Sequence, residues 1–137
     1  MSSFRKCLAS LLVAASFVAA PVVSADQLTP KQLADARTRV ETAANLAAIG
    51  KAEKDSELLL VAAKLLSKVD APVALPGSDL KDGKPTSLAL GSYLDEAKAL
   101  GADTSKAAMS KPLPASDYCY WYYSCDSYNN CMWIYVC

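Results

Sequence analysis

Four cysteines near the C-terminal end recur at every sixth position, and cysteines at fixed spacing either bind a metal or form disulfides. They are Cys119, Cys125, Cys131 and Cys137. Zinc and iron–sulfur sites normally use close C-x₂₋₄-C pairs, and this spacing contains none. A redox-active C-x-x-C pair is also lacking. We therefore expect two structural disulfides, with no metal and no other cofactor.

The residues between the cysteines indicate which of them can meet. Bonded cysteines have Cα atoms within about 7 Å, whereas six steps of extended strand span roughly 20 Å. Neighbouring cysteines can therefore bond only across a turn. Residues 120–124 and 132–136 are aromatic and β-branched, which favours strand, and residues 126–130 read DSYNN, which favours a turn. The sequence predicts a β-hairpin with Tyr128 at its tip.

A hairpin centred on Tyr128 places the cysteines directly opposite one another. Four cysteines permit three pairings, and this fold selects the nested one. The predicted disulfides are Cys119–Cys137 and Cys125–Cys131. An interlocked pairing, 119–131 with 125–137, is the main alternative.

The same segment, residues 118–137, contains both tryptophans and six of the seven tyrosines. Strand alternation brings four of these rings to one face, paired across the strands. The pairs are Trp121 with Tyr135 and Tyr123 with Trp133. In one interpretation this face packs on the rest of the chain, which is poor in rings. In the other it is displayed, and these four residues are the candidate contacts for an unknown protein, a peptide or a second copy.

Residues 1–25 have the three parts of a secretory signal peptide. Arg5 and Lys6 form a basic start, residues 8–20 are apolar, and VSA at 23–25 fits a cleavage site. The apolar run is shorter than the roughly twenty residues that a membrane-spanning helix needs. We expect cleavage after Ala25, a secreted or periplasmic protein, and no stable membrane anchor. A short buried N-terminal helix is the alternative.

Residues 26–110 show the periodicity of a helical domain. Thr29 is a typical cap with Pro30 at the first helical position, and apolar residues then recur at spacings of three and four as far as Ile49. Gly50 is expected to end this helix. A second helix is predicted over 57–69, capped by Asp55 or Ser56. Its short connection to the first indicates an antiparallel pair.

The region after the second helix is rich in proline and glycine. Residues 70–87 are expected to form a mobile, slack loop. A third helix is predicted over 88–100, capped by Thr86 or Ser87 and ended by Gly101. One more short helix is expected over 103–109, and the proline-containing residues 111–117 form a linker to the hairpin.

The composition excludes several classes of function. The chain has no histidine, so it lacks the commonest general base and metal ligand. It also has no glycine-rich phosphate loop, and its carboxylates are scattered; we therefore expect no enzyme. Loss of Arg5 and Lys6 with the leader leaves two more acidic than basic residues. No basic cluster remains for nucleic acid.

The predicted fold is mainly α, a small bundle of three to four short antiparallel helices followed by a disulfide-stapled β-hairpin. The predicted function is that of an exported, non-enzymatic binding or structural module that uses this hairpin. The alternative is a secreted precursor, in which a helical propiece releases the C-terminal cysteine-rich peptide. The change in composition at Asp117 favours that alternative, although no dibasic or double-glycine sequence marks a cleavage point.

Overall fold

The protein is mainly α with a C-terminal hairpin, as the sequence predicts. The structure is a computed structural model that describes residues 28–106 and 119–137. These residues contain three α-helices, which is the lower number of the predicted three to four. The elements are α1 (Pro30–Glu53), α2 (Ser56–Leu66), β1 (Leu80–Lys81), β2 (Lys84–Pro85), α3 (Ala89–Ala99), the 3-10 helix η1 (Thr104–Lys106), β3 (Tyr120–Cys125) and β4 (Cys131–Val136).

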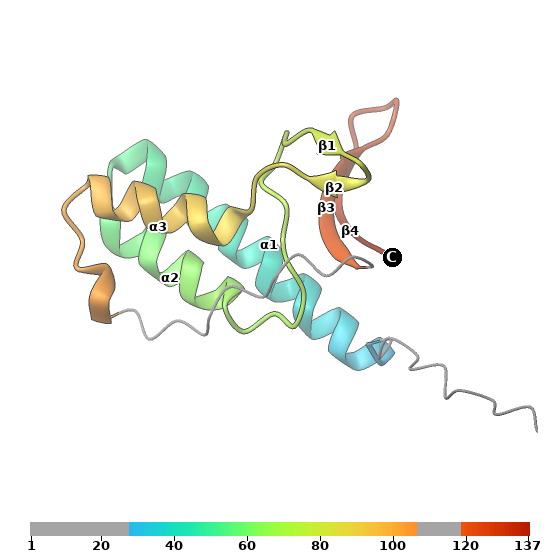
Figure 1. The fold of residues 1–137 in the computed structure, drawn as a ribbon, viewed down its shortest axis with the longest axis horizontal. Helices are drawn as coiled ribbons and strands as arrows, with labels where there is room; N and C mark the ends of the chain where they lie inside the picture. Colours follow the sequence, from blue (N-terminus) through green and yellow to red (C-terminus); the bar gives the residue numbers. More distant parts are fainter. Residues whose placement is uncertain (1–27, 107–118) are drawn as a thin grey trace, which may run out of the picture.

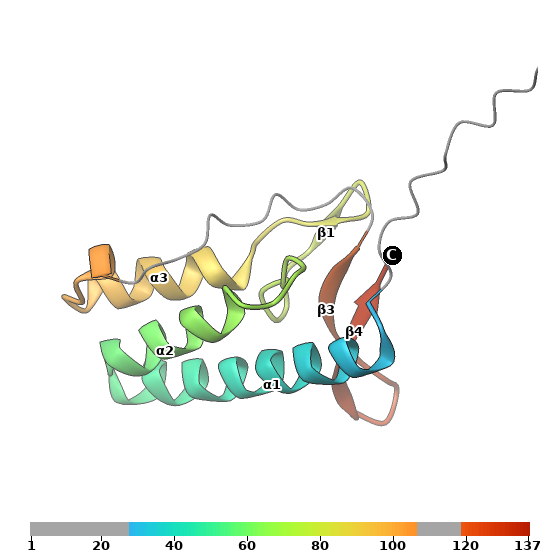
Figure 2. The same ribbon diagram turned by 90° about the horizontal axis from the view of Figure 1, so that it is seen from below.

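The three helices lie side by side, and the β3–β4 hairpin stands at one end of them, across the first half of α1 (Figures 1 and 2). The predicted signal peptide (1–25) and linker (111–117) lie outside the described residues. The expected short helix over 103–109 is represented by η1, and its last residues also lie outside the described part of the chain.

Helix α1 begins as predicted but does not end at Gly50. The Thr29 hydroxyl accepts a bond from the Gln32 N–H, and the Gln32 side chain accepts one from the Thr29 N–H, so the two form a capping box. The helix continues to Glu53 and is capped by Lys54, which has a left-handed backbone with φ 56°. The prediction that Gly50 stops the helix is wrong.

Gly50 is needed for close packing between α1 and α2. A Cβ atom added to it would lie 3.1 Å from the Asp55 carbonyl oxygen and 3.1 Å from the Leu58 Cβ. Neither atom belongs to the flexible end of a side chain. The glycine therefore lets the start of α2 fold back against the end of α1.

We expect Gly50→Ala to destabilise the protein although alanine is the better helix former. Overpacking should outweigh the helix propensity and lower the free energy of unfolding by about 1–2 kcal/mol. Gly91→Ala is the matched control, because Gly91 lies in α3 and a Cβ atom added there would meet no neighbouring side chain within 4 Å among the described residues. It should raise the free energy of unfolding by about 0.5–1 kcal/mol. Urea unfolding of both variants measures the difference, and a stabilising Gly50→Ala would contradict the packing role.

Helix α2 is capped by a side chain next to it in the sequence, whereas helix α3 is capped by a group from a distant residue. The Asp55 carboxylate accepts bonds from the first N–H groups of α2, as predicted; α2 ends at Leu66 and not at about Val69. Neither Thr86 nor Ser87 caps α3, whose N-cap is Leu88 with no side-chain bond. Instead the first N–H of α3 donates to the Val73 carbonyl at 2.9 Å. A carbonyl from the preceding loop takes the place of the expected local hydroxyl.

The loop over 70–87 is held in place, contrary to the slack connection that its composition suggests. Residues 72–74 run parallel to β3 and bond to the backbone of Trp121. The Trp121 N–H donates to the Pro72 carbonyl at 2.9 Å, and the Trp121 carbonyl accepts from the Ala74 N–H at 2.8 Å. Further along, β1 and β2 form a small hairpin around Asp82 and Gly83, both with positive φ, as a tight two-residue turn requires. The proline and glycine residues therefore shape an ordered connection.

The core is built from small side chains on the helices and large ones from the hairpin. Most of the buried helical residues are alanine, and Val40, Leu59 and Tyr93 are the larger exceptions along with Leu66. Trp121 and Trp133 complete the same cluster. Alanine-rich faces let the helices approach closely, while the two indoles supply much of the apolar volume.

Candidate functional site

The β3–β4 hairpin has the predicted register. Opposed residues run from Tyr120 with Val136 to Cys125 with Cys131, so the turn is centred on Tyr128. The ring pairs also form as expected. The centroids of Trp121 and Tyr135 are 5.3 Å apart, and those of Tyr123 and Trp133 are 5.2 Å apart.

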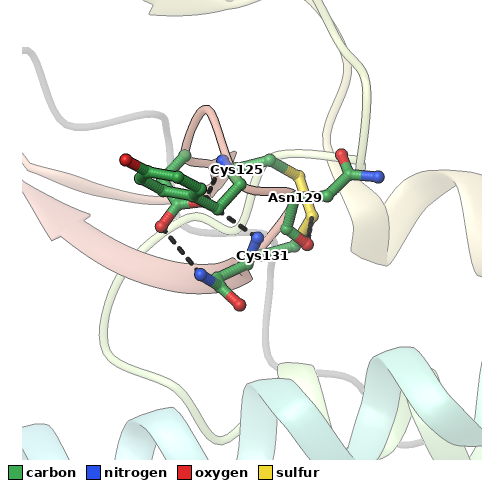
Figure 3. Close-up of a disulfide and its surroundings, with 6 residues drawn as sticks. Cys125, Asn129 and Cys131 are labelled. Carbon is green, nitrogen blue, oxygen red and sulfur yellow. Dashed lines mark hydrogen bonds between the residues drawn. A yellow bond between two sulfur atoms is a disulfide. The ribbon is translucent and has the colours of Figure 1, made fainter.

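Both disulfides follow the predicted nested pairing. Cys119–Cys137 joins the open end of the hairpin and Cys125–Cys131 closes the base of its loop, each with Cα atoms 3.9 Å apart. Figure 3 shows the second bond between the two strands beside Asn129. The two bonds fix the strand ends, so the register between them cannot slip.

The loop at the tip is organised by one carboxylate. Asp126 accepts bonds from the backbone N–H of Tyr128 and of Asn130 and from the Asn130 side-chain amide, at 2.9, 2.9 and 3.0 Å. These bonds, the Asn130 side chain first, lower the pKa of Asp126 below its ordinary value. Asn129 takes a left-handed conformation with φ 66°, which asparagine tolerates. The polar residues that predicted a turn make it.

The four candidate contact residues lie on the face of the hairpin that packs against the helices. Trp121 is 1% exposed and Trp133 4%, while Tyr123 and Tyr135 are partly buried against the same core. This placement agrees with the packing interpretation of the aromatic face. A binding role for all four residues stays a prediction. Of the four, Tyr123 and Tyr135 are more accessible than the two tryptophans.

At the tip end, this face is not fully covered, and a groove opens between the hairpin and α1. Its volume is about 400 Å³. It is lined by Glu41, Ala44, Asn45 and Ala48 of α1, by Pro76, and by Tyr123, Cys131, Met132 and Trp133 of the hairpin. Two of the four predicted contacts therefore border it. Sequence reasoning missed the α1 residues, because only the fold shows which helix the hairpin meets.

The groove carries polar groups on its helical wall and apolar groups elsewhere. Glu41 is bonded to Arg37 at 2.7 Å, so its charge is partly compensated. Asn45 is exposed, and its amide offers both a donor and an acceptor. With Tyr123 and Trp133 opposite, the arrangement can hold an apolar or aromatic group and orient it through a few hydrogen bonds.

The opposite face of the hairpin points away from the helices. It is formed by Tyr120, Tyr122, Met132, Ile134 and Val136, and we call these residues the outer face. Met132 is 46% exposed and Ile134 37%, and the rings of Tyr120 and Tyr122 meet edge to face at 6.4 Å. Strand alternation in the observed register places these residues together on this side.

A third feature joins the far ends of α1 and α3. Lys51 Nζ lies 2.8 Å from a Glu96 carboxylate oxygen and 5.4 Å from the centre of the Tyr93 ring. Burial of the phenol, and secondarily the Glu96 charge, raises the pKa of Tyr93. A hollow of about 450 Å³ beside these groups is lined mainly by Lys51, Lys54, Leu59, Glu96, Ala99 and Leu100. The ion pair between Lys51 and Glu96 tethers the ends of α1 and α3.

Within residues 28–106 and 119–137, no cluster of three or more acidic, cysteine or histidine side chains could hold a metal ion. None of the helices in the same ranges combines the length and hydrophobicity needed to cross a membrane.

No protein-family model matches the chain, and no curated protein or solved structure is significantly similar to it.

Proposed function

We propose that this chain is an exported, non-enzymatic binding module that takes a peptide segment of a partner into the groove between α1 and the hairpin tip. The observation that carries the proposal is the groove itself, because Tyr123 and Trp133 form one wall and α1 the other. Its volume of about 400 Å³ lies in the range of ligand pockets.

The groove chemistry favours an uncharged or weakly charged ligand side chain. Tyr123, Trp133 and Pro76 offer apolar contact, and the charge of Glu41 is already engaged by Arg37. The Asn45 amide is placed to bond a peptide backbone. Disulfides suit an oxidising compartment, which supports export together with the signal-peptide pattern of residues 1–25.

The packing of the hairpin argues against the precursor alternative. Releasing the C-terminal peptide would remove Trp121 and Trp133 from the core of the helices. Truncation of a buried tryptophan costs about 3–5 kcal/mol, so a helical propiece left alone would lose most of its stability. A hairpin that completes the core is better suited to remain attached.

The proposal is tested by selecting binding peptides from a displayed random library against the oxidised chain. Ala48→Trp should fill the groove and weaken the selected peptides about tenfold or more, because it removes the space that the ligand occupies. Ala34→Trp is the matched control, since Ala34 is exposed on the same helix and does not line the groove. Isothermal titration with each variant measures the effect. Peptides that bind both variants equally well would show that the groove is not the site.

A further inference from the structure

The hydrogen bonds of β3 show which edge of the hairpin already pairs with another segment of the chain. The Trp121 N–H donates to the Pro72 carbonyl at 2.9 Å, and the Trp121 carbonyl accepts from the Ala74 N–H at 2.8 Å. The backbone groups of Trp121 therefore point away from β4. In an antiparallel pair such a residue faces a partner that also makes no bonds across the pair. This partner is Tyr135.

The same alternation applies along the whole of β4. The backbone N–H and C=O groups of Cys131, Trp133 and Tyr135 point away from β3, toward the edge of the hairpin that β4 forms. Among the described residues, no backbone hydrogen bond links this edge to another segment. Figures 1 and 2 show β4 on the side of β3 away from the loop that follows α2. One edge of the hairpin is thus paired with residues 72–74, and the other has no partner strand there.

The sequence of β4 lacks the residues that usually prevent edge-to-edge pairing. Natural edge strands are protected by charged residues, prolines or bulges, whereas residues 131–137 read CMWIYVC. Asp126 is the only charged side chain between 119 and 137, and it lies in the loop at the tip. Beside the edge, Met132 and Ile134 expose 46% and 37% of their surface. A charged partner would find no complement here, whereas an identical strand meets no repulsion.

We propose that β4 pairs antiparallel with β4 of a second copy, about a two-fold axis at Ile134, and joins two hairpins into one continuous sheet. This register uses the full length of 131–137. It places Trp133 of one copy opposite Tyr135 of the other in a hydrogen-bonded pair, and Ile134 opposite itself in a pair with closely spaced side chains. Met132 meets Val136 of the other copy on the outer face. The two-fold makes the contact self-complementary and closed.

The test measures the mass of the oxidised full chain by sedimentation. The wild-type chain should sediment as a dimer at micromolar concentration. Ile134→Lys and Ile134→Glu should each raise the dimer dissociation constant by about a hundredfold, because like charges then face each other across the axis and the isoleucine contact is lost. An equimolar mixture of the two variants should restore the dimer, since opposite charges then meet.

Tyr122→Lys is the matched control. Tyr122 faces Ile134 on the same outer face but belongs to β3, whose edge is covered by residues 72–74. This variant should remain dimeric. A wild-type chain that stays monomeric up to millimolar concentration, a mixture that fails to re-form the dimer, or equal dissociation by Tyr122→Lys would each overturn the proposal. The last result would indicate pairing through the face and not the edge. Amide NMR spectra of every variant establish that it is folded.

Discussion

Reduction of both disulfides is expected to unfold the helices as well as the hairpin. An isolated two-stranded hairpin is at best marginally stable in water, so β3 and β4 depend on their covalent links. The bonds close segments of 18 and 6 residues in sequence separation, and chain entropy assigns them about 3 and about 2 kcal/mol respectively. Their sum is comparable to the whole stability of a small domain.

The helices should follow because the hairpin supplies their core. Trp121 and Trp133 pack into the same buried cluster as Val40, Leu59 and Tyr93. When the strands separate, these helices retain mainly alanine contacts. The expected result is a loss of amide protection in α1 and α2 on reduction, measured by hydrogen exchange of the oxidised and reduced chain.

Two paired variants separate the contributions of the bonds. Replacing both Cys119 and Cys137 by serine should lower the free energy of unfolding by about 1 kcal/mol more than replacing both Cys125 and Cys131, because the longer loop loses more entropy when closed. A reduced chain whose helices keep their protection would show that the helical layer is stable by itself and that the hairpin is an attachment.

The hairpin was the most predictable part of the molecule because several local signals agree there. The cysteine spacing, the turn-forming residues around Tyr128 and the strand-forming rings on both sides specify one register between them. Each signal acts over a few residues, so no distant contact is needed to read it. The caps at Thr29 and Asp55 were predictable for the same reason.

The errors arise where a distant segment decides the local structure. Gly50 has the residue type of a helix end, but α2 passes so close that glycine is required inside the helix. The start of α3 lacks the expected hydroxyl cap because Val73 accepts its first N–H. The groove is a further case: Asn45 and Ala48 gain their position only when the hairpin docks on α1.

The order of the loop over 70–87 has the same cause. Its proline and glycine content prevents long regular structure, and that local inference is correct. Val73 and Ala74 are nevertheless buried, at 5% and 0% exposure, because β3 offers its free edge to them. Strand β3, near the C-terminal end, therefore orders the loop over 70–87. Through Val73 it also fixes the cap of α3. The hairpin, the loop over 70–87 and helix α3 are thus coupled through the position of Trp121.

This coupling predicts a large effect for a single residue. Trp121→Ala is expected to lower the free energy of unfolding by about 3–5 kcal/mol, because it removes a ring that is 1% exposed and leaves a cavity in the buried cluster that also contains residues of the helices. The loss should extend to α1 and α3 and not stay within the hairpin. Urea unfolding followed by hydrogen exchange at individual amides measures both its size and its extent.

Tyr128→Ala is the control for this variant, since Tyr128 is an aromatic residue of the same hairpin but 85% exposed. Its removal should change the free energy of unfolding by less than about 0.5 kcal/mol. Trp133→Ala should resemble Trp121→Ala, because Trp133 enters the same core from the other strand. If instead the tryptophan variants leave the helices unaffected while the hairpin loosens, the aromatic face serves something other than the core. The display interpretation of Trp121, Tyr123, Trp133 and Tyr135 would then replace the packing one.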